Sequence, residues 1–147
     1  MEATKREQWL RSRKIGNLVW SDRSSNEMNW SRAKQYCENL SEGGFTDWRL
    51  PTISELRTTI KNCSGSKSGG SCRVSDSCLA EGCWSENCYC PSEGSYNKLS
   101  GDDGEVWLWS SSTRSDDRDD VWHVYYPFAE VGLSHKSDND GYVRCVR

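Results

Sequence analysis

The sequence predicts one α+β domain that is strengthened by disulfides. Three observations support this prediction: two helical patterns that each follow a capping residue, several short segments with strand-like alternation, and eight cysteines in 147 residues. Hydrophobic residues make up only 34% of the chain, and the mean hydropathy is -0.88. Because a core of this composition gains much from covalent cross-links, we expect disulfides rather than free thiols.

The first helical pattern follows Asn29, whose side chain can cap the start of a helix. The residues that recur at helical spacing and share one face are Trp30, Ala33, Cys37 and Leu40. Gly43 and Gly44 follow, and we expect them to end the helix, because glycine is common just after a helix C-terminus.

The sequence DWRLPT at positions 47–52 predicts a corner followed by a second helix. Pro51 disfavours helical geometry in the residue before it. Thr52 lies three residues before Glu55, which is the spacing of a reciprocal capping box. The apolar stripe of this helix consists of Ile53, Leu56 and Ile60.

Strand-like patterns occur at 16–20, 106–110, 121–126 and 141–147. We expect the first and the last to meet in one sheet, with Val143 and Cys145 facing one way. Each middle segment is expected to bury one face. The predicted apolar face consists of Trp107, Trp109, Trp122 and Val124. The opposite face then carries Leu108, His123 and Tyr125.

Four motifs occur in a characteristic order: the helical pattern from Trp30 to Leu40, DWRLPT at 47–52, WSSST at 109–113, and VRCVR at 143–147. In order and spacing they resemble the Lcl C-terminal domain family, a bacterial family named after a collagen-like adhesin. The resemblance covers roughly residues 16–147, with a gap in the middle. It implies a C-type-lectin-like fold, related to that of formylglycine-generating enzymes, in which two helices pack on small antiparallel sheets and the chain ends meet.

The resemblance also implies a disulfide between Cys37 on the first helix and Cys145 on the last strand. Such a bridge closes a long loop and adds about 4 to 5 kcal/mol of stability in the chain-entropy model.

A cysteine-rich insert at about 62–101 fills the gap in the resemblance. Its cysteines are Cys63, Cys72, Cys78, Cys83, Cys88 and Cys90. We expect all six to pair, but six cysteines allow 15 connectivities and the sequence does not choose among them. A zinc site is the alternative, although the insert has neither a Cys-x-x-Cys pair nor a histidine. Trp84, Tyr89 and Tyr96 are expected to form a local core, or one of them a ligand platform.

We expect residues 1–14 to be a tail or the end of a linker, and residues 15–147 to be the domain. The cysteine content indicates an oxidising compartment, so we expect a secreted or cell-surface location, either extracellular or periplasmic. Neither a signal peptide nor a membrane span is apparent. We therefore expect a chain that was processed or cut from a longer exported protein.

Acidic clusters at 102–105, 116–120 and 138–140 suggest calcium, because loop carboxylates are its preferred ligands. The sequence contains no twelve-residue calcium loop, and it lacks the calcium-dependent sugar-binding signatures of classical C-type lectins. We therefore predict no cofactor and no metal ligands, and keep calcium as an alternative.

The predicted ligand face is formed by loops at 101–105, 114–120 and 125–140, because binding residues concentrate on loops held by a rigid frame. Its candidate residues are Asp116, Asp117, Arg118, Asp119, Tyr125, Tyr126 and His135. Tyr125, Tyr126 and Phe128 are expected to be exposed aromatic side chains that serve a partner site.

Charge and histidine content restrict the function further. The net charge of -3 opposes binding to polyanions such as nucleic acid and sulfated polysaccharides. The adhesin after which the family is named is associated with sulfated polysaccharides, so we expect a different ligand here. Neither His123 nor His135 lies beside a recognisable nucleophile. We therefore expect a noncatalytic binding or adhesion module for a glycan or a protein. The alternatives are a structural cap or homo-oligomerisation domain of a longer surface or fibrous protein, and a hypervariable lectin-like binder.

Overall fold

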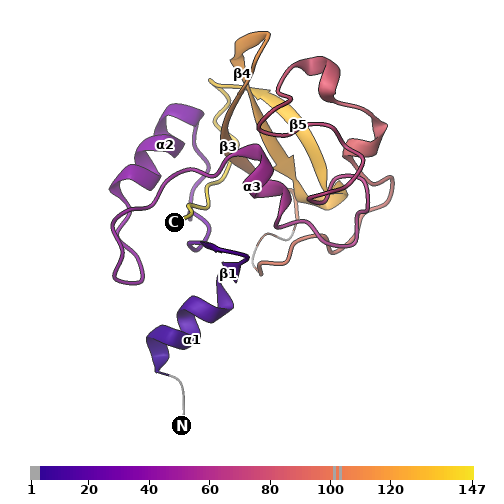
Figure 1. The fold of residues 1–147 in the computed structure, drawn as a ribbon. Helices are drawn as coiled ribbons and strands as arrows, with labels where there is room; N and C mark the ends of the chain where they lie inside the picture. Colours follow the sequence, from indigo (N-terminus) through magenta and orange to yellow (C-terminus); the bar gives the residue numbers. More distant parts are fainter. Residues whose placement is uncertain (1–3, 101, 103) are drawn as a thin grey trace.

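The computed structural model describes residues 4–100, 102 and 104–147, which form a small α+β fold (Figure 1). The helices are α1 (Lys5–Ser12), α2 (Trp30–Asn39) and α3 (Ile53–Arg57). The strands are β1 (Lys14–Ile15), β2 (Leu18–Val19), β3 (Trp107–Arg114), β4 (Asp117–Tyr125) and β5 (Glu130–His135). One antiparallel sheet contains β1 and β2, and the other has the order β3-β4-β5. The predicted α+β class with small antiparallel sheets is confirmed.

The three-stranded sheet has a hydrophobic core on each face. On one face, α3 and the insert pack against Leu108, Trp122 and Val124. On the other face, α2 and the end of the chain pack against Trp109 and Val121. In Figure 1, α2 and the insert accordingly lie on opposite sides of this sheet.

The register of β3 and β4 differs by one residue from the predicted register. Trp109 lies opposite His123, and Leu108 lies opposite Val124. Because opposite residues share a face, the tryptophans of β3 lie with His123, whereas Leu108 lies with Trp122 and Val124. The predicted grouping is therefore wrong. Alternation could not determine the register here, because Leu108 and Trp109, which point to opposite faces, are both apolar and fully buried.

His123 is part of the packed interior. Its ring lies 4.6 Å from the ring centre of Trp107, and its Nδ1 is 3.0 Å from the hydroxyl of Ser134. Burial lowers the pKa of His123 to about 3, so the imidazole is neutral at physiological pH.

The helix α2 begins as predicted and ends earlier than predicted. The Asn29 side chain caps its start by accepting a hydrogen bond from the backbone N–H of Arg32, at 3.0 Å. It ends at Asn39, because the next residue takes extended angles of φ -71° and ψ 131°. Gly43 and Gly44 instead form a tight turn with positive φ values of 61° and 85°.

The predicted capping box at the start of α3 is confirmed. The backbone N–H of Glu55 donates to Oγ1 of Thr52 at 3.2 Å, and the N–H of Thr52 donates to the Glu55 carboxylate at 2.8 Å. The same carboxylate accepts two hydrogen bonds of 2.7 Å from Arg49. The hydroxyl of Ser112 on β3 caps Ile53 at 2.9 Å, which fixes the helix start against the sheet.

The C-terminal segment 141–147 joins the separate parts of the fold. The N–H of Val19 on β2 donates to the carbonyl of Arg147 at 2.9 Å. The N–H of Arg49, in the corner before α3, donates to the carbonyl of Val146 at 2.9 Å. The segment also pairs with β3. The expected meeting of residues 16–20 with 141–147 is therefore confirmed, but they meet through an isolated bridge between Trp20 and Val146, because 141–147 is not a regular strand and belongs to neither sheet.

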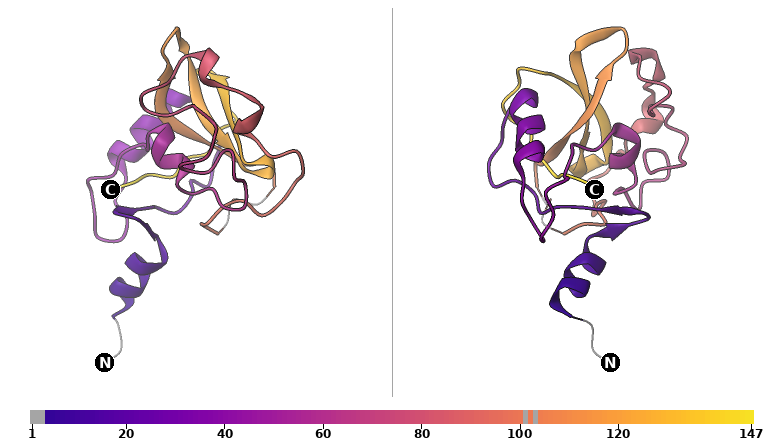
Figure 2. Two further views of the ribbon diagram at one scale, coloured as in Figure 1. Left: turned by 45° about the vertical axis from the view of Figure 1, so that its right-hand side comes forward. Right: turned by 60° about the vertical axis from the view of Figure 1, so that its left-hand side comes forward.

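Residues 1–14 contain a helix that the sequence interpretation missed. The helix α1 begins with a second capping box, in which the Glu7 N–H donates to the Thr4 hydroxyl at 3.1 Å. Both views in Figure 2 show α1 extending from the body of the domain. Its Trp9 packs edge-on against Trp48, with ring centres 6.3 Å apart. The spacing of Thr4 and Glu7 was the available signal for this helix.

All eight cysteines are paired, as predicted. The bridge between Cys37 and Cys145 joins α2 to the C-terminal segment, with a Cα separation of 5.5 Å. The three bridges of the insert are nested in sequence: Cys63–Cys90 encloses Cys72–Cys88, which encloses Cys78–Cys83.

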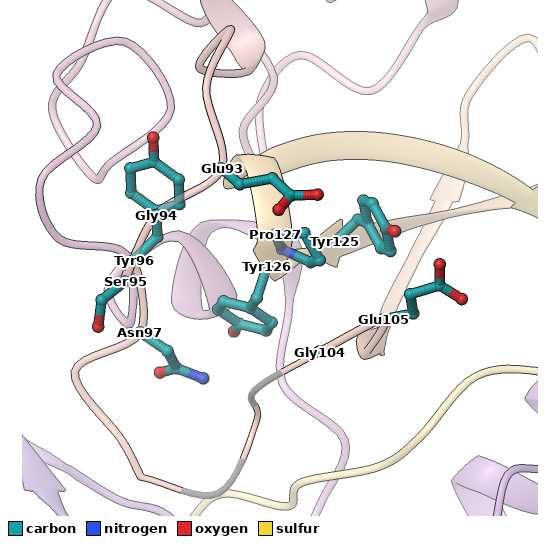
Figure 3. Close-up of a pocket in the computed structure, with 10 residues that line it drawn as sticks. All are labelled: Glu93, Gly94, Ser95, Tyr96, Asn97, Gly104, Glu105, Tyr125, Tyr126 and Pro127. Atoms are coloured by element: carbon teal, nitrogen blue, oxygen red, sulfur yellow. The ribbon is translucent and has the colours of Figure 1, made fainter.

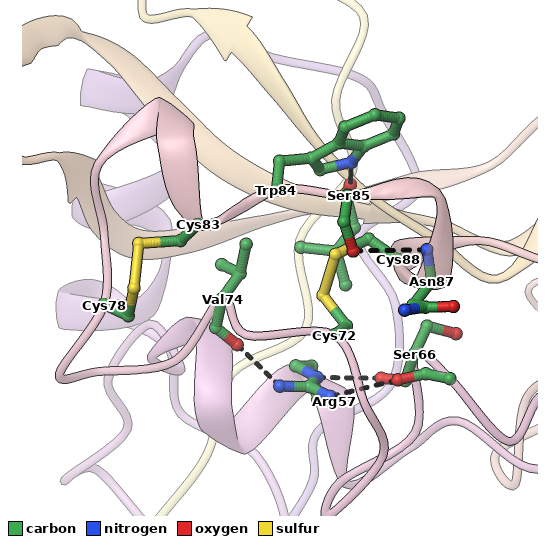
Figure 4. Close-up of a disulfide and its surroundings, with 12 residues drawn as sticks. Arg57, Ser66, Cys72, Val74, Cys78, Cys83, Trp84, Ser85, Asn87 and Cys88 are labelled. Atoms are coloured by element: carbon green, nitrogen blue, oxygen red, sulfur yellow. Dashed lines mark hydrogen bonds between the residues drawn. A yellow bond between two sulfur atoms is a disulfide. The ribbon is translucent and has the colours of Figure 1, made fainter.

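A buried arginine anchors the insert to α3 (Figure 4). The guanidinium of Arg57 donates to the carbonyls of Ser66 at 2.8 Å, Val74 at 2.6 Å and Lys67 at 2.9 Å. Burial lowers the pKa of Arg57. The insert thus combines covalent cross-links with a polar attachment to the helix that precedes it.

The bridge between α2 and the C-terminal segment should contribute more stability than the smallest bridge of the insert. Replacing Cys37 and Cys145 together by serine should lower the free energy of unfolding by about 4 to 5 kcal/mol, because it frees a long loop. Replacing Cys78 and Cys83, which are 5 positions apart, should cost about 2 kcal/mol in the same chain-entropy model. Denaturant titration of both double variants measures the difference, and equal losses would contradict this ranking.

Candidate functional site

The predicted ligand-binding residues lie at opposite ends of β4. Residues 116–119 lie at the β3–β4 hairpin, and His135 ends β5 near them. Tyr125 and Tyr126 lie at the other end of the strand. The 9 residues of β4 place these two groups roughly 26 Å apart. The predicted residues therefore form two separate groups.

The hairpin tip is attached to the insert. Most residues of the predicted connection at 114–120 belong to β3 or β4. Arg114, the last residue of β3, binds three carboxylates. Its guanidinium lies 3.1 Å from Glu81, 2.8 Å from Asp116 and 3.1 Å from Asp120. Asp116 also accepts a hydrogen bond from the backbone N–H of Glu81, at 3.2 Å. The polar groups of Asp116 thus already have partners within the domain.

Most of the other predicted polar residues at this end also have partners. Asp119 forms an ion pair with Lys136 at 2.8 Å, and Asp117 accepts a hydrogen bond from the Asp119 N–H at 3.1 Å. His135 bonds through Nδ1 to a serine hydroxyl two residues further on, at 2.7 Å. Arg118 is exposed, and its guanidinium has no such partner in the described part of the chain.

Tyr126 is buried, so the expectation that it is an exposed aromatic residue is wrong. Only 3% of its surface is accessible, and its hydroxyl is 2.6 Å from that of Thr59. A 3₁₀ turn at the end of β4 directs it into the core next to α3. Tyr125 and Phe128 are half-buried, with ring centres 6.4 Å apart.

Two hollows meet at Tyr125 and Glu105. One has a volume of about 210 Å³ and is shown in Figure 3. The other has a volume of about 650 Å³ and extends along the C-terminal segment. We call them together the Tyr125 groove. Its lining includes Arg23, Glu27, Glu93, Tyr96, Asn97, Glu105, Trp107, Tyr125, Asp140 and Tyr142.

The C-terminal segment positions a second aromatic ring in this groove. The backbone N–H of Tyr142 donates to the carbonyl of Trp107 at 2.9 Å, and its hydroxyl donates to Glu27 at 3.3 Å. The guanidinium of Arg23 lies over the Tyr142 ring, 4.4 Å from its centre. These contacts fix Tyr142 in the same groove as Tyr125.

Carboxylates dominate the charge of the groove. Within the described part of the chain, Glu93, Glu105 and Asp140 form no ion pair. Burial and then the nearby carboxylates of Glu105 and Glu93 raise the pKa of Tyr125. Arg23 is the basic residue among the lining residues. The groove therefore has a negative field with one local positive group.

The predicted acidic cluster at 102–105 does not act as one group. Asp102 is buried and accepts hydrogen bonds from Arg144, at 2.9 Å, and from Asn97. Burial raises the pKa of Asp102, and Arg144 opposes this effect. Glu105 lines the groove, whereas Asp103 lies outside the described residues.

The family model of the Lcl C-terminal domain matches residues 11–147, which is nearly the whole chain. The chain belongs to the Lcl C-terminal domain family. A search of curated proteins finds no significant match. The four disulfides of this Lcl C-terminal domain fit an extracellular or periplasmic location.

The sequence interpretation missed several groove residues of this Lcl C-terminal domain, among them Arg23, Glu27 and Tyr142. Alternation along 141–147 was a signal for Tyr142, because it lies between inward-facing residues. No motif marks Arg23 or Glu27, which reach the groove only through folding. The expected loop at 125–140 contains β5, a strand that the sequence interpretation also missed.

Two general features of the described residues, 4–100, 102 and 104–147, complete the site description. No group of three or more His, Cys, Asp or Glu side chains among them is arranged to hold a metal ion. None of their helices is long and apolar enough to cross a membrane.

The ion pair at the hairpin tip should be visible in an acid titration. The hydrogen bonds from Arg114 lower the pKa of Asp116 from 3.8 to about 2. Because the folded-state pKa is lowered, the stabilisation is present above about pH 4 and is lost as the pH falls towards 2. Carboxyl NMR shifts should give a midpoint near 2 for Asp116, and Arg114→Met should raise it towards the ordinary value. An ordinary midpoint in the unsubstituted protein would contradict the ion pair.

Proposed function

We propose that this Lcl C-terminal domain is a noncatalytic binding module of a secreted or cell-surface bacterial protein, and that it binds a glycan in the Tyr125 groove. The observation that supports this most is the presence of Tyr125 and Tyr142 in one open groove with unpaired carboxylates. A sugar ring offers a C–H face that packs on an aromatic ring, and hydroxyls that donate to carboxylates.

The groove favours a neutral or positively charged glycan. Glu93, Glu105 and Asp140 lack counterions within the described residues, and the whole chain has a net charge of -3. A sulfated polysaccharide would meet like charge in this groove, which opposes binding. A protein partner with the same surface chemistry is an alternative ligand.

The C-type-lectin-like fold belongs to this proposal. It is supported by two helices packed on a small antiparallel sheet, by the joined chain ends, and by the bridge from α2 to the last segment. The alternatives, a structural cap or oligomerisation domain and a hypervariable binder, stay predictions.

Binding to the groove should depend on Tyr125. Tyr125→Ala removes the half-buried ring and should weaken a glycan ligand found on an array by about tenfold, as expected for the loss of one aromatic contact. Isothermal titration with the selected glycan measures the change, and thermal unfolding checks that the variant is folded.

The matched control is the double variant Asp117→Ala and Arg118→Ala at the other end of β4. It should remain folded and bind the glycan as the unsubstituted protein does. Loss of binding in this control, with binding retained in Tyr125→Ala, would move the site to the hairpin tip and contradict the proposal.

A further inference from the structure

Three carboxylates surround the Tyr125 side chain, where the two hollows of the groove meet. Glu130 lies directly opposite Tyr125 in the register of β4 and β5, so the two side chains are on the same face of the sheet. Glu105 lines both hollows and Glu93 lines the smaller one. Figure 3 shows the Tyr125 ring between the carboxylates of Glu93 and Glu105. Burial and then the charges of Glu105, Glu93 and Glu130 raise the pKa of Tyr125, so all three carboxylates act on one hydroxyl.

These carboxylates have no counterion within the described part of the chain. Glu93, Glu105 and Glu130 form no ion pair there. The basic residue among the lining residues, Arg23, lies with its Nε 4.0 Å from the buried carboxylate of Asp102. The charge of Arg23 is therefore partly balanced inside the fold, and the groove keeps an excess of negative charge.

A neutral ligand would leave this excess uncompensated. Glu130 is half-buried, and burial raises its pKa because the charged carboxylate has lost part of its water. A ligand that packs on Tyr125 removes more of this water, and a neutral hydroxyl replaces it with a weaker hydrogen bond than a charged donor does. A protonated amine donates hydrogen bonds and also supplies the opposite charge. The groove therefore favours a ligand that carries an amine.

The carboxylates are distributed along the whole groove. Glu93 lies in the smaller hollow, Glu105 where the hollows meet, and Asp140 in the larger hollow. Tyr125 and Tyr142 supply aromatic rings along the same path. A chain of sugar rings with one amine per ring presents repeated positive charges together with faces that pack on aromatic rings. A single lysine side chain presents one charge and no ring face, so it matches this arrangement less well.

We propose that the ligand of the Tyr125 groove is a glycan with free, protonated amino groups, as in a deacetylated hexosamine polymer. One sugar ring packs on Tyr125, and its amine is attracted by Glu105 and Glu130, with Glu93 adding to the attraction. This inference rests on the proposed glycan function and adds the charge of the ligand to it.

The experiment compares three β-1,4-linked sugar tetramers that differ in one substituent. The amino tetramer consists of glucosamine, the hydroxyl tetramer of glucose and the acetylated tetramer of N-acetylglucosamine. Binding to the oxidised protein is measured by isothermal titration in mildly acidic, low-salt buffer, in which the sugar amine is protonated. The amino tetramer should bind about tenfold more tightly than the other two, as expected for a few partly exposed ion pairs. Added salt should reduce this difference, because it screens exposed charges.

Variants separate the charge contact from the ring contact. Glu105→Gln and Glu130→Gln keep the size of the side chain and should each weaken the amino tetramer by about threefold, with little effect on the hydroxyl tetramer. Tyr125→Ala should weaken both tetramers, because it removes the ring contact. Glu86→Gln removes the same charge from an exposed position of the insert outside the groove lining, and should leave both affinities unchanged. Near-ultraviolet circular dichroism checks the fold of each variant.

The outcomes distinguish this inference from the glycan proposal. Equal or tighter binding of the hydroxyl tetramer, or of an uncharged glycan found on an array, would overturn the amine inference and leave the glycan proposal standing. Equal effects of Glu86→Gln and Glu105→Gln would also overturn it, because they would show a general attraction to the acidic chain. If no glycan binds, the glycan proposal fails and this inference with it, and binding of the polyamine spermidine would then indicate a basic protein segment as the ligand.

Discussion

The structure depends most on the pairing of the last seven residues with the rest of the chain. Segment 141–147 hydrogen-bonds to β2, to the corner before α3 and to β3, and Cys145 is bonded to Cys37 on α2. Elements that are distant in sequence are thereby fixed against one another. The same segment sets Tyr142 into the Tyr125 groove, so the architecture and the proposed glycan site share one constraint.

A second constraint is that a polar chain has to cover both faces of a three-stranded sheet. The domain does this with two separate cores, one under α3 and the insert and one under α2. Where the insert lacks apolar residues, nested disulfides and the buried guanidinium of Arg57 hold it in place. Burial of both faces leaves binding surface at the edges of the sheet. The proposed glycan site lies at such an edge, at the end of β4.

Local signals in the sequence predicted local structure well. The capping residues Asn29 and Thr52 mark the starts of α2 and α3, because a cap is formed by residues only a few positions apart. The Cys37–Cys145 bridge came from the family resemblance. The predicted register of β3 against β4 was wrong. Apolar residues occur on both faces of β3, so a shift of one residue leaves an equally apolar pattern facing β4's core.

The candidate sites were less predictable than the fold. The charged residues of the hairpin looked available for a ligand, yet Asp116 and Asp119 are held by Arg114 and Lys136. Such pairing depends on the final distance between side chains, which composition does not report. Trp84 was expected mainly as local core, and its exposure follows from a disulfide map that the sequence left open among 15 possibilities.

Native-state hydrogen exchange tests the central claim most directly. If segment 141–147 holds the fold together, the amide of Val146, which donates to Arg49 at 2.8 Å, should exchange only through global unfolding. Its opening free energy should equal that of the Val124 amide in the middle of the sheet. A markedly lower opening free energy at Val146, with Val124 still protected, would show that the segment detaches independently and would contradict the account.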